Sequence, residues 1–263
     1  MTGLIRFAAF LLGPTALLLL VIVFARAFEV KPDGRQILYI GNSLTSSNSL
    51  PETVFEMAKA RGHTLLYFEH TPGGTRLSEH ASSRTLSRAI EAGAWEKVVI
   101  QGQSQYSAFH DWQLERDVFP YATDIIEQIR ELHPDAQIVL YQTMAHRDGD
   151  QENKDVIPEV GTYTGMQTRI NSAYERLASL NSAELAPVGV AWMSFRRDFP
   201  DVELYTDDRH PNPLGSYLAA CVVFTALFDM PCSGTPIPSD VNAELAGAAQ
   251  KIADRTASEH SLP

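Results

Sequence analysis

The feature that most constrains the fold of this sequence is a regular alternation of short apolar segments with longer segments of helical periodicity. Strand-like segments occupy residues 36–40, 65–68, 97–100 and 138–141, with a weaker fifth candidate at 186–190 that Pro187 and Gly189 interrupt. Helical spacing of apolar residues covers 51–61, 77–92, 114–132, 163–180, 214–228 and 241–257. Because such an alternation implies βαβ crossovers, it predicts a three-layer α/β/α sandwich with a mainly parallel five-stranded sheet.

One domain of this class accounts for most of the 263 residues. Hydrophobic residues make up 44% of the chain, which is enough for a sizeable core and excludes disorder as the main state. The sequence contains no repeat and no low-complexity tract. We therefore assign residues 36–263 to a single domain and residues 28–35 to a linker.

Residues 1–27 differ in composition from the domain. An uncharged run at residues 7–24 follows Arg6, and Ala25-Arg26-Ala27 has the small-x-small pattern of a signal peptidase site. The segment is interpreted as a signal peptide or an N-terminal membrane anchor, since a buried globular helix would be expected to have a polar face. Both interpretations predict export: a periplasmic or extracellular domain, or one that contacts the membrane only through residues 7–24.

The first predicted strand leads into Gly41-Asn42-Ser43-Leu44-Thr45. Ligands bind outside the carboxyl ends of the strands in such sheets, so the Ser43 hydroxyl is well placed to be a nucleophile. A serine hydroxyl needs a base to become reactive. Without one, Ser43 would be interpreted as a turn or capping residue.

A base and its carboxylate partner occur late in the chain. Asp207 lies three residues before His210, and Pro211 follows. At this spacing the carboxylate can accept the imidazole Nδ1–H and turn Nε2 toward a hydroxyl, as a Ser-His-Asp relay requires. An Asp-x-x-His motif alone is common in surface loops, but together with Ser43 it predicts nucleophilic catalysis.

These segments resemble the SGNH/GDSL hydrolase superfamily, esterases and lipases with a flavodoxin-like three-layer fold. Residues 37–45 look like its first block, with Asn42 where many members have Asp, and residues 71–75 look like its second block. Asp207 and His210 match the last block. The resemblance covers residues 36–230 and is sharpest to a poorly characterised bacterial branch with a Gly-Asn-Ser start, a Gln-rich third block and an Asp-x-x-His-Pro end. It implies an oxyanion hole that includes the backbone N–H groups of Ser43 and Gly74.

The third block departs from the family pattern. Where the family has an asparagine that donates to the oxyanion, this chain has Gln101, Gln103 and Gln105. A glutamine amide can donate the same hydrogen bond. Gln101 and Gln103 share strand parity and are the expected donors. Gln105 remains an alternative, and so does a role for all three in satisfying loop backbone.

The predicted function is that of an exported serine esterase that hydrolyses an acyl or acetyl ester through an acyl-enzyme, with no cofactor and no metal. A carbohydrate ester is implied by the resemblance alone. The alternatives are a non-catalytic envelope or carbohydrate-binding protein and an acyltransferase that uses the same residues. The net charge of −11 disfavours nucleic acid as a partner and an anionic substrate, and mildly favours a neutral ester. The oligomeric state is left open.

Several polar, cysteine and aromatic residues outside the predicted relay and oxyanion hole are expected to have structural roles. His80 and His110 are expected to be hydrogen-bonded surface groups. The polar run at residues 146–152 is expected to form a solvated loop or a substrate lid, because it lacks the full calcium-loop pattern. Cys221 and Cys232 are expected to be unpaired, buried thiols. Trp192 and Phe195, three residues apart, are expected in a helix core.

Overall fold

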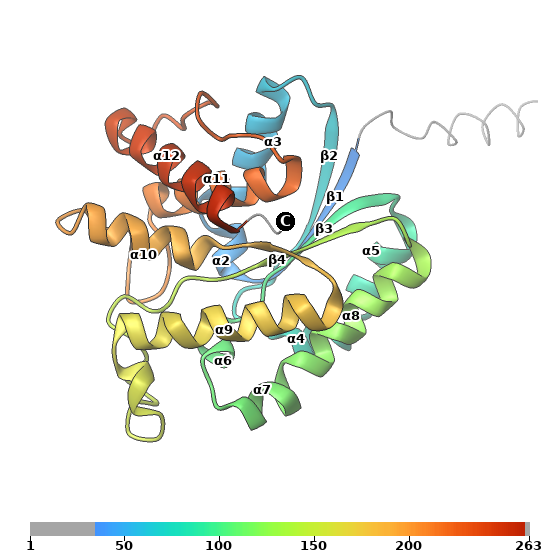
Figure 1. Cartoon of the computed structure of the whole chain (residues 1–263). Helices are drawn as coiled ribbons and strands as arrows, with labels where there is room; N and C mark the ends of the chain where they lie inside the picture. The colour runs from blue at the N-terminus through green and yellow to red at the C-terminus, as the bar shows by residue number, and fades with distance from the viewer. Residues whose placement is uncertain (1–34, 261–263) are drawn as a thin grey trace, which may run out of the picture. The chain divides into compact units, whose positions relative to one another are not determined.

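The computed structural model describes residues 35–260 (Figure 1). The expected signal peptide or anchor at residues 1–27 and the linker up to residue 34 lie outside the described residues. Arg35, the last residue of the expected linker, already belongs to the first strand. Within residues 35–260, no helix combines the length and the apolar character needed to span a membrane.

The sheet has five strands, and every pair of neighbouring strands is parallel. The strands are β1 (Arg35–Ile40), β2 (Leu65–His70), β3 (Trp95–Ile100), β4 (Gln137–Tyr141) and β5 (Glu184–Ala186). Their spatial order is β2-β1-β3-β4-β5, the flavodoxin-like order. The prediction of a mainly parallel five-stranded sheet is confirmed, and among the described residues the sheet is entirely parallel.

Helices cover both faces of the sheet, as Figure 1 shows. The helices are α2 (Ser43–Ser46), α3 (Leu50–Ala60), α4 (Leu77–Ala81), α5 (Arg84–Ala92), α6 (Ser104–Ser107), α7 (Asp111–Asp117), α8 (Phe119–Leu132), α9 (Tyr163–Asn181), α10 (Val188–Asp198), α11 (Pro213–Phe228) and α12 (Ala243–His260). Two 3₁₀ segments are η1 (Ser47–Ser49) and η2 (Pro158–Gly161). The predicted three-layer sandwich is therefore the observed architecture.

Alternating side chains of the central strands supply two separate cores. In β1, Ile37 and Tyr39 pack with α3, α10, α11 and α12, whereas Leu38 and Ile40 pack with α4, α5, α8 and α9. All four of these side chains are essentially inaccessible to solvent. Burial on both faces explains why the strands are continuous apolar runs in the sequence.

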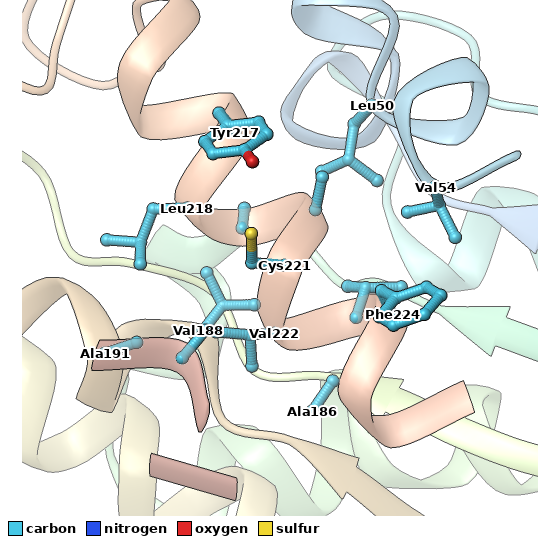
Figure 2. Packing of buried hydrophobic residues seen from close by; sticks show 14 of the residues in the cluster. Leu50, Val54, Ala186, Val188, Ala191, Tyr217, Leu218, Cys221, Val222 and Phe224 are labelled. Atoms are coloured by element: carbon cyan, nitrogen blue, oxygen red, sulfur yellow. The ribbon is translucent and has the colours of Figure 1, made fainter. Parts of the chain in front are cut away.

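Helix α11 is the most deeply buried helix of the first core. Thirteen of its sixteen residues are buried, and Figure 2 shows Leu218 and Val222 near Val188 and Ala191 of the neighbouring α10. Trp192 and Phe195 are also fully buried in this core, as expected.

Two predicted helices are interrupted in the structure. The segment 77–92 divides into α4 and α5, because the Ser83 hydroxyl accepts a hydrogen bond from the Leu86 N–H and caps a new helix. The segment 114–132 divides at Val118, where Pro120 in the first turn of α8 has no N–H to continue the preceding helix.

The prediction for the fifth strand is wrong in its bounds. The strand spans Glu184–Ala186, and Val188 already begins α10. Pro187 separates the two elements, since its fixed φ and missing N–H suit a helix entry better than a strand interior.

The expectation of unpaired thiols is also wrong. Cys221 of α11 forms a disulfide with Cys232, which lies in the segment that follows the helix. The chain reverses after Asp229, whose φ of +52° ends α11 in the left-handed region. This reversal brings the two Cα atoms within 5.3 Å, a distance that a disulfide spans.

Candidate active site

The candidate site lies at the carboxyl ends of β1 and β3, where the order of the strands in the sheet reverses. Strands β2 and β3 lie on opposite sides of β1, so the loops that leave β1 and β3 diverge and open a crevice at their carboxyl ends. A cavity of about 370 Å³ occupies this position. It is lined by Asn42, Ser43, Leu44, Gly73, Gly74, Gln103, Ser104, Gln105, His146, Arg209 and His210.

Ser43, His210 and Asp207 form one hydrogen-bonded series. The Ser43 Oγ lies 3.0 Å from the His210 Nε2, although the two residues are 167 positions apart in the sequence. The His210 Nδ1 lies 2.8 Å from the Asp207 Oδ2. The structure thus brings these three predicted residues together with the predicted orientation of the imidazole.

The loop that carries His210 is held by its own backbone. The Thr206 N–H donates to the His210 carbonyl at 2.9 Å, and Tyr205 pairs with Pro211 in an antiparallel bridge. Burial raises the pKa of the Asp207 carboxyl, but hydrogen bonds from the His210 and Arg209 N–H groups and from the imidazole hold it well below its usual range. Asp207 is therefore an anion at neutral pH.

The nucleophile candidate begins the short helix α2. The Asn42 Oδ1 accepts a hydrogen bond from the Leu44 N–H at 3.1 Å and caps this helix. The Asn42 Nδ2 donates to the Thr75 carbonyl at 3.2 Å, which joins the Ser43 loop to the Gly73-Gly74 loop. Gly74 has a φ of +71°, a backbone conformation that favours glycine.

The two glutamines expected at the oxyanion occupy different places. Gln101 is fully buried and does not line the cavity. Its Oε1 accepts from the Asn42 N–H and the Thr45 hydroxyl, each at 2.9 Å, and its Nε2 donates to the Gly102 carbonyl. Gln103 lines the cavity, and its Oε1 is buried without a hydrogen-bond partner among the described residues.

His80 differs from the expected surface group, because only 1% of it is exposed. Its Nε2 lies 2.9 Å from the Gly41 carbonyl oxygen, directly behind the nucleophile loop, and its ring contacts that of His70. Burial lowers the pKa of His80 to about 4. The imidazole is therefore neutral at neutral pH, and Nε2–H donates to Gly41. His110 caps α7 and is half-buried.

The polar run at 146–152 forms a loop, as expected, in which Asp148, Gln151 and Glu152 are exposed whereas three other residues are buried. Asp150 is 1% exposed, its Oδ1 accepts from the Glu152 N–H, and its Oδ2 accepts from the Asn153 side chain. The amide of Gln105, which lines the cavity, donates a hydrogen bond to the Glu152 carboxylate. Within residues 35–260, no cluster of three His, Cys, Asp or Glu side chains is suited to hold a metal ion.

With this sheet order and with the contacts that join Ser43, His210 and Asp207, the chain is similar to the SGNH hydrolases. The structural neighbours include a DUF4886 family protein from Bacteroides uniformis, with a TM-score of 0.72, 21% identity, and coverage of 85% of this chain and 95% of that one. They also include a candidate SGNH hydrolase from Slackia heliotrinireducens, with a TM-score of 0.61 and 28% identity over 74% of this chain and all of that one. A third is the psychrotrophic esterase EstA from a Pseudoalteromonas species, with a TM-score of 0.53 and 13% identity over 74% of this chain and 97% of that one.

No family model matches the sequence, and no curated protein matches it. The comparison therefore rests on solved structures. They confirm the predicted resemblance to the SGNH hydrolases at the level of the superfamily.

Proposed function

We propose that the domain is a serine esterase that hydrolyses an acyl or acetyl ester. The observation that carries this proposal is the continuous contact from Ser43 Oγ to His210 Nε2 and from His210 Nδ1 to Asp207. The structural similarity to an SGNH hydrolase and to esterases supports it.

In the proposed reaction, the His210 Nε2 takes the proton of Ser43 while the Ser43 Oγ attacks the ester carbonyl. Asp207, kept ionised by its hydrogen bonds, stabilises the imidazolium that forms. His210 then gives the proton to the departing alcohol oxygen and leaves an acyl-enzyme. A water molecule, deprotonated by His210, hydrolyses the acyl-enzyme and restores Ser43.

The oxyanion would be held by the N–H groups of Ser43 and Gly74 and by the Gln103 amide. Ser43 is the first residue of α2, where the helix leaves N–H groups without an intrahelical partner. Gln103 is preferred over Gln101 because Gln103 lines the cavity, whereas the Gln101 amide is engaged with Gly102, Asn42 and Thr45.

The proposal places the domain outside the cytoplasm. Residues 7–24 and the Ala25-Arg26-Ala27 pattern support export, and so does the Cys221–Cys232 disulfide, because disulfides persist in oxidising compartments. The expected partner is a polar ester rather than nucleic acid, in agreement with the net charge of −11.

The hydrolysis of 4-nitrophenyl acetate tests the esterase assignment. We expect Ser43→Ala to lower kcat/KM by roughly 10⁴-fold or more, because the nucleophile is lost. Ser46→Ala, a change in the same short helix but outside the cavity lining, is the matched control and should retain activity. Hydrolysis that persists in Ser43→Ala contradicts the residue assignment, and no hydrolysis by the unmodified protein favours the non-catalytic alternative.

A further inference from the structure

His146 and Arg209 line the same cavity as the relay but are not part of it. Only 7% of His146 is exposed, and the hydrogen bonds that it forms with other described residues come from its backbone N–H and carbonyl. Neither ring nitrogen belongs to the fully buried, unpaired polar atoms of the described residues, so the ring can still form hydrogen bonds in the cavity. Its position in the wall of the cavity makes the imidazole accessible to a ligand bound there.

The backbone on both sides of His146 is firmly held. The Ala145 carbonyl accepts a hydrogen bond from the Tyr205 hydroxyl at 2.6 Å, and the Arg147 N–H donates to the Asp208 carbonyl at 2.7 Å. Both partners belong to the loop that carries the relay. The imidazole is therefore preorganised relative to His210, which lowers the cost of binding a ligand there.

The hydrogen bonds that hold the backbone beside His146 also indicate which part of an ester His146 and Arg209 would contact. Arg209 is the neighbour of His210 in the chain, and His146 is tied to the same loop, whereas Gly74 and Gln103 enter the cavity from other loops. His210 must deliver a proton to the departing alcohol oxygen. Residues grouped with His210 consequently border the alcohol portion of the substrate, and Gly74 and Gln103 border the carbonyl oxygen.

The hydrogen-bond donors and acceptors of His146 and Arg209 indicate which ligand groups the two side chains can bind. The Asp208 carboxylate engages the Nε and Nη2 atoms of Arg209, so that Nη1 is available as a donor. Burial lowers the pKa of His146, and the Arg209 charge lowers it further, so a neutral imidazole offers one donor and one acceptor. Among the described residues that line the cavity, none carries a carboxylate.

We propose that His146 and Arg209 form a subsite for the alcohol portion of the ester, and that this alcohol carries further hydroxyl groups beside the ester oxygen. This inference rests on the proposed function, because the proton transfer by His210 defines the alcohol side. It makes the two residues determinants of specificity, distinct from the relay and from the oxyanion hole.

The test compares two acetate esters that differ only in hydroxyl groups: glycerol 1-acetate and propyl acetate. The readout is the ratio of their kcat/KM values, measured by titration of the released acid. The unmodified protein should prefer glycerol 1-acetate. We expect His146→Leu and Arg209→Met each to lower the ratio by about tenfold, as the loss of a hydrogen bond to a substrate hydroxyl does.

Two further variants control the experiment. His146→Asn keeps a donor and an acceptor and should retain part of the preference. Arg147→Met removes a neighbouring exposed arginine that pairs with Asp148 outside the cavity lining, and should leave the ratio unchanged. Thermal unfolding of each variant verifies that it is folded.

A ratio that stays unchanged in folded His146→Leu and Arg209→Met, while hydrolysis still depends on Ser43, overturns the subsite and leaves the esterase assignment intact. The absence of Ser43-dependent hydrolysis of both esters overturns the esterase assignment and the subsite together.

Discussion

At the scale of single residues, the peptide group between Gly41 and Asn42 is held at both of its ends by buried side chains. The His80 Nε2–H donates to the Gly41 carbonyl, and the Gln101 Oε1 accepts from the Asn42 N–H, each at 2.9 Å. This peptide precedes Ser43 directly. Fixing it holds the Ser43 hydroxyl and N–H in place, as the proposed reaction requires.

The two glutamines should respond differently to substitution. We expect Gln103→Leu to lower kcat for an aryl ester by roughly 10²- to 10³-fold, since removal of one oxyanion donor costs about 3–4 kcal/mol of barrier. Gln101→Leu should instead lower the free energy of unfolding by about 1–3 kcal/mol, because Asn42 and Thr45 lose a buried acceptor. Steady-state kinetics and urea unfolding of both variants measure the two effects.

The comparison between the two variants is decisive for the assignment. If kcat is unaffected in Gln103→Leu while the protein remains folded, Gln103 is not an oxyanion donor. If Gln101→Leu leaves stability unchanged, Gln101 does not hold the nucleophile loop.

His80 predicts a dependence of stability on pH. Its pKa is about 4 in the folded protein, against an ordinary value of 6.5, because burial disfavours the charged ring. Below its ordinary pKa the unfolded chain binds a proton that the folded protein does not. The stabilisation by neutral His80 is therefore complete above about pH 6.5 and is lost as the pH falls toward 4, by up to roughly 3 kcal/mol.

His80→Gln tests this dependence, because a glutamine can still donate to Gly41 but does not titrate. Urea unfolding at about pH 7 and about pH 4.5 should show a smaller loss of stability for His80→Gln than for the unmodified protein. His260→Gln, at the end of α12, is the control and should keep the original loss. Equal losses in His80→Gln and the unmodified protein would refute the role of His80.

The contact between Asp207 and His210 could be predicted because the two residues are three positions apart, whereas the contact between Ser43 and His210, across 167 residues, is predicted from the two motifs taken together. Ser43 follows an apolar strand and a glycine. The positions of Gln101 and His80 could not be predicted. Gln101 reaches Asn42 across 59 residues and His80 reaches Gly41 across 39, and no local pattern encodes such contacts.

At the scale of helices and strands, the apolar periodicity located the main elements but not their interruptions. Residues 77–92 keep helical spacing across Ser83, and 114–132 keep it across Val118, because both halves of each segment face the same core. A cap at Ser83 and a proline at position 120 are the signals that mark the breaks. Similarly, Pro187 marks the end of β5 rather than its interior.

The disulfide between α11 and the segment that follows this helix leads to a prediction about stability. Cys221 and Cys232 enclose a short loop, with a sequence separation of 11. Closing a loop of this size stabilises a protein by about 3 kcal/mol, which corresponds to a Tm difference of roughly 6–12 °C for a domain of this size. Thermal unfolding with and without reductant should show this loss.

The Cys221→Ala/Cys232→Ala double variant is the matched control, with a low Tm that reductant does not change further. A Tm of the unmodified protein that is insensitive to reductant, together with two free thiols in the unreduced, unfolded chain, would contradict the disulfide.

At the scale of the whole domain, the site depends on a strand order that alternation alone does not determine. The sequence predicts five strands joined by helices, but the arrangement β2-β1-β3-β4-β5 follows from tertiary packing. This order makes β1 and β3 neighbours, and the loops that leave them diverge and open the crevice lined by Ser43 and Gln103. The distribution of charge is likewise a property of the folded domain, since the net charge is −11 but no carboxylate lines the described cavity.

The central claim is that Ser43 is a nucleophile activated by His210. The most direct measurement is reaction of the purified protein with a fluorophosphonate, followed by mass spectrometry of the peptides. We expect one phosphonyl group per chain, attached to Ser43, and strongly reduced labelling in His210→Ala because the base is lost. An unlabelled protein, or a label on another residue that persists in Ser43→Ala, would contradict the claim.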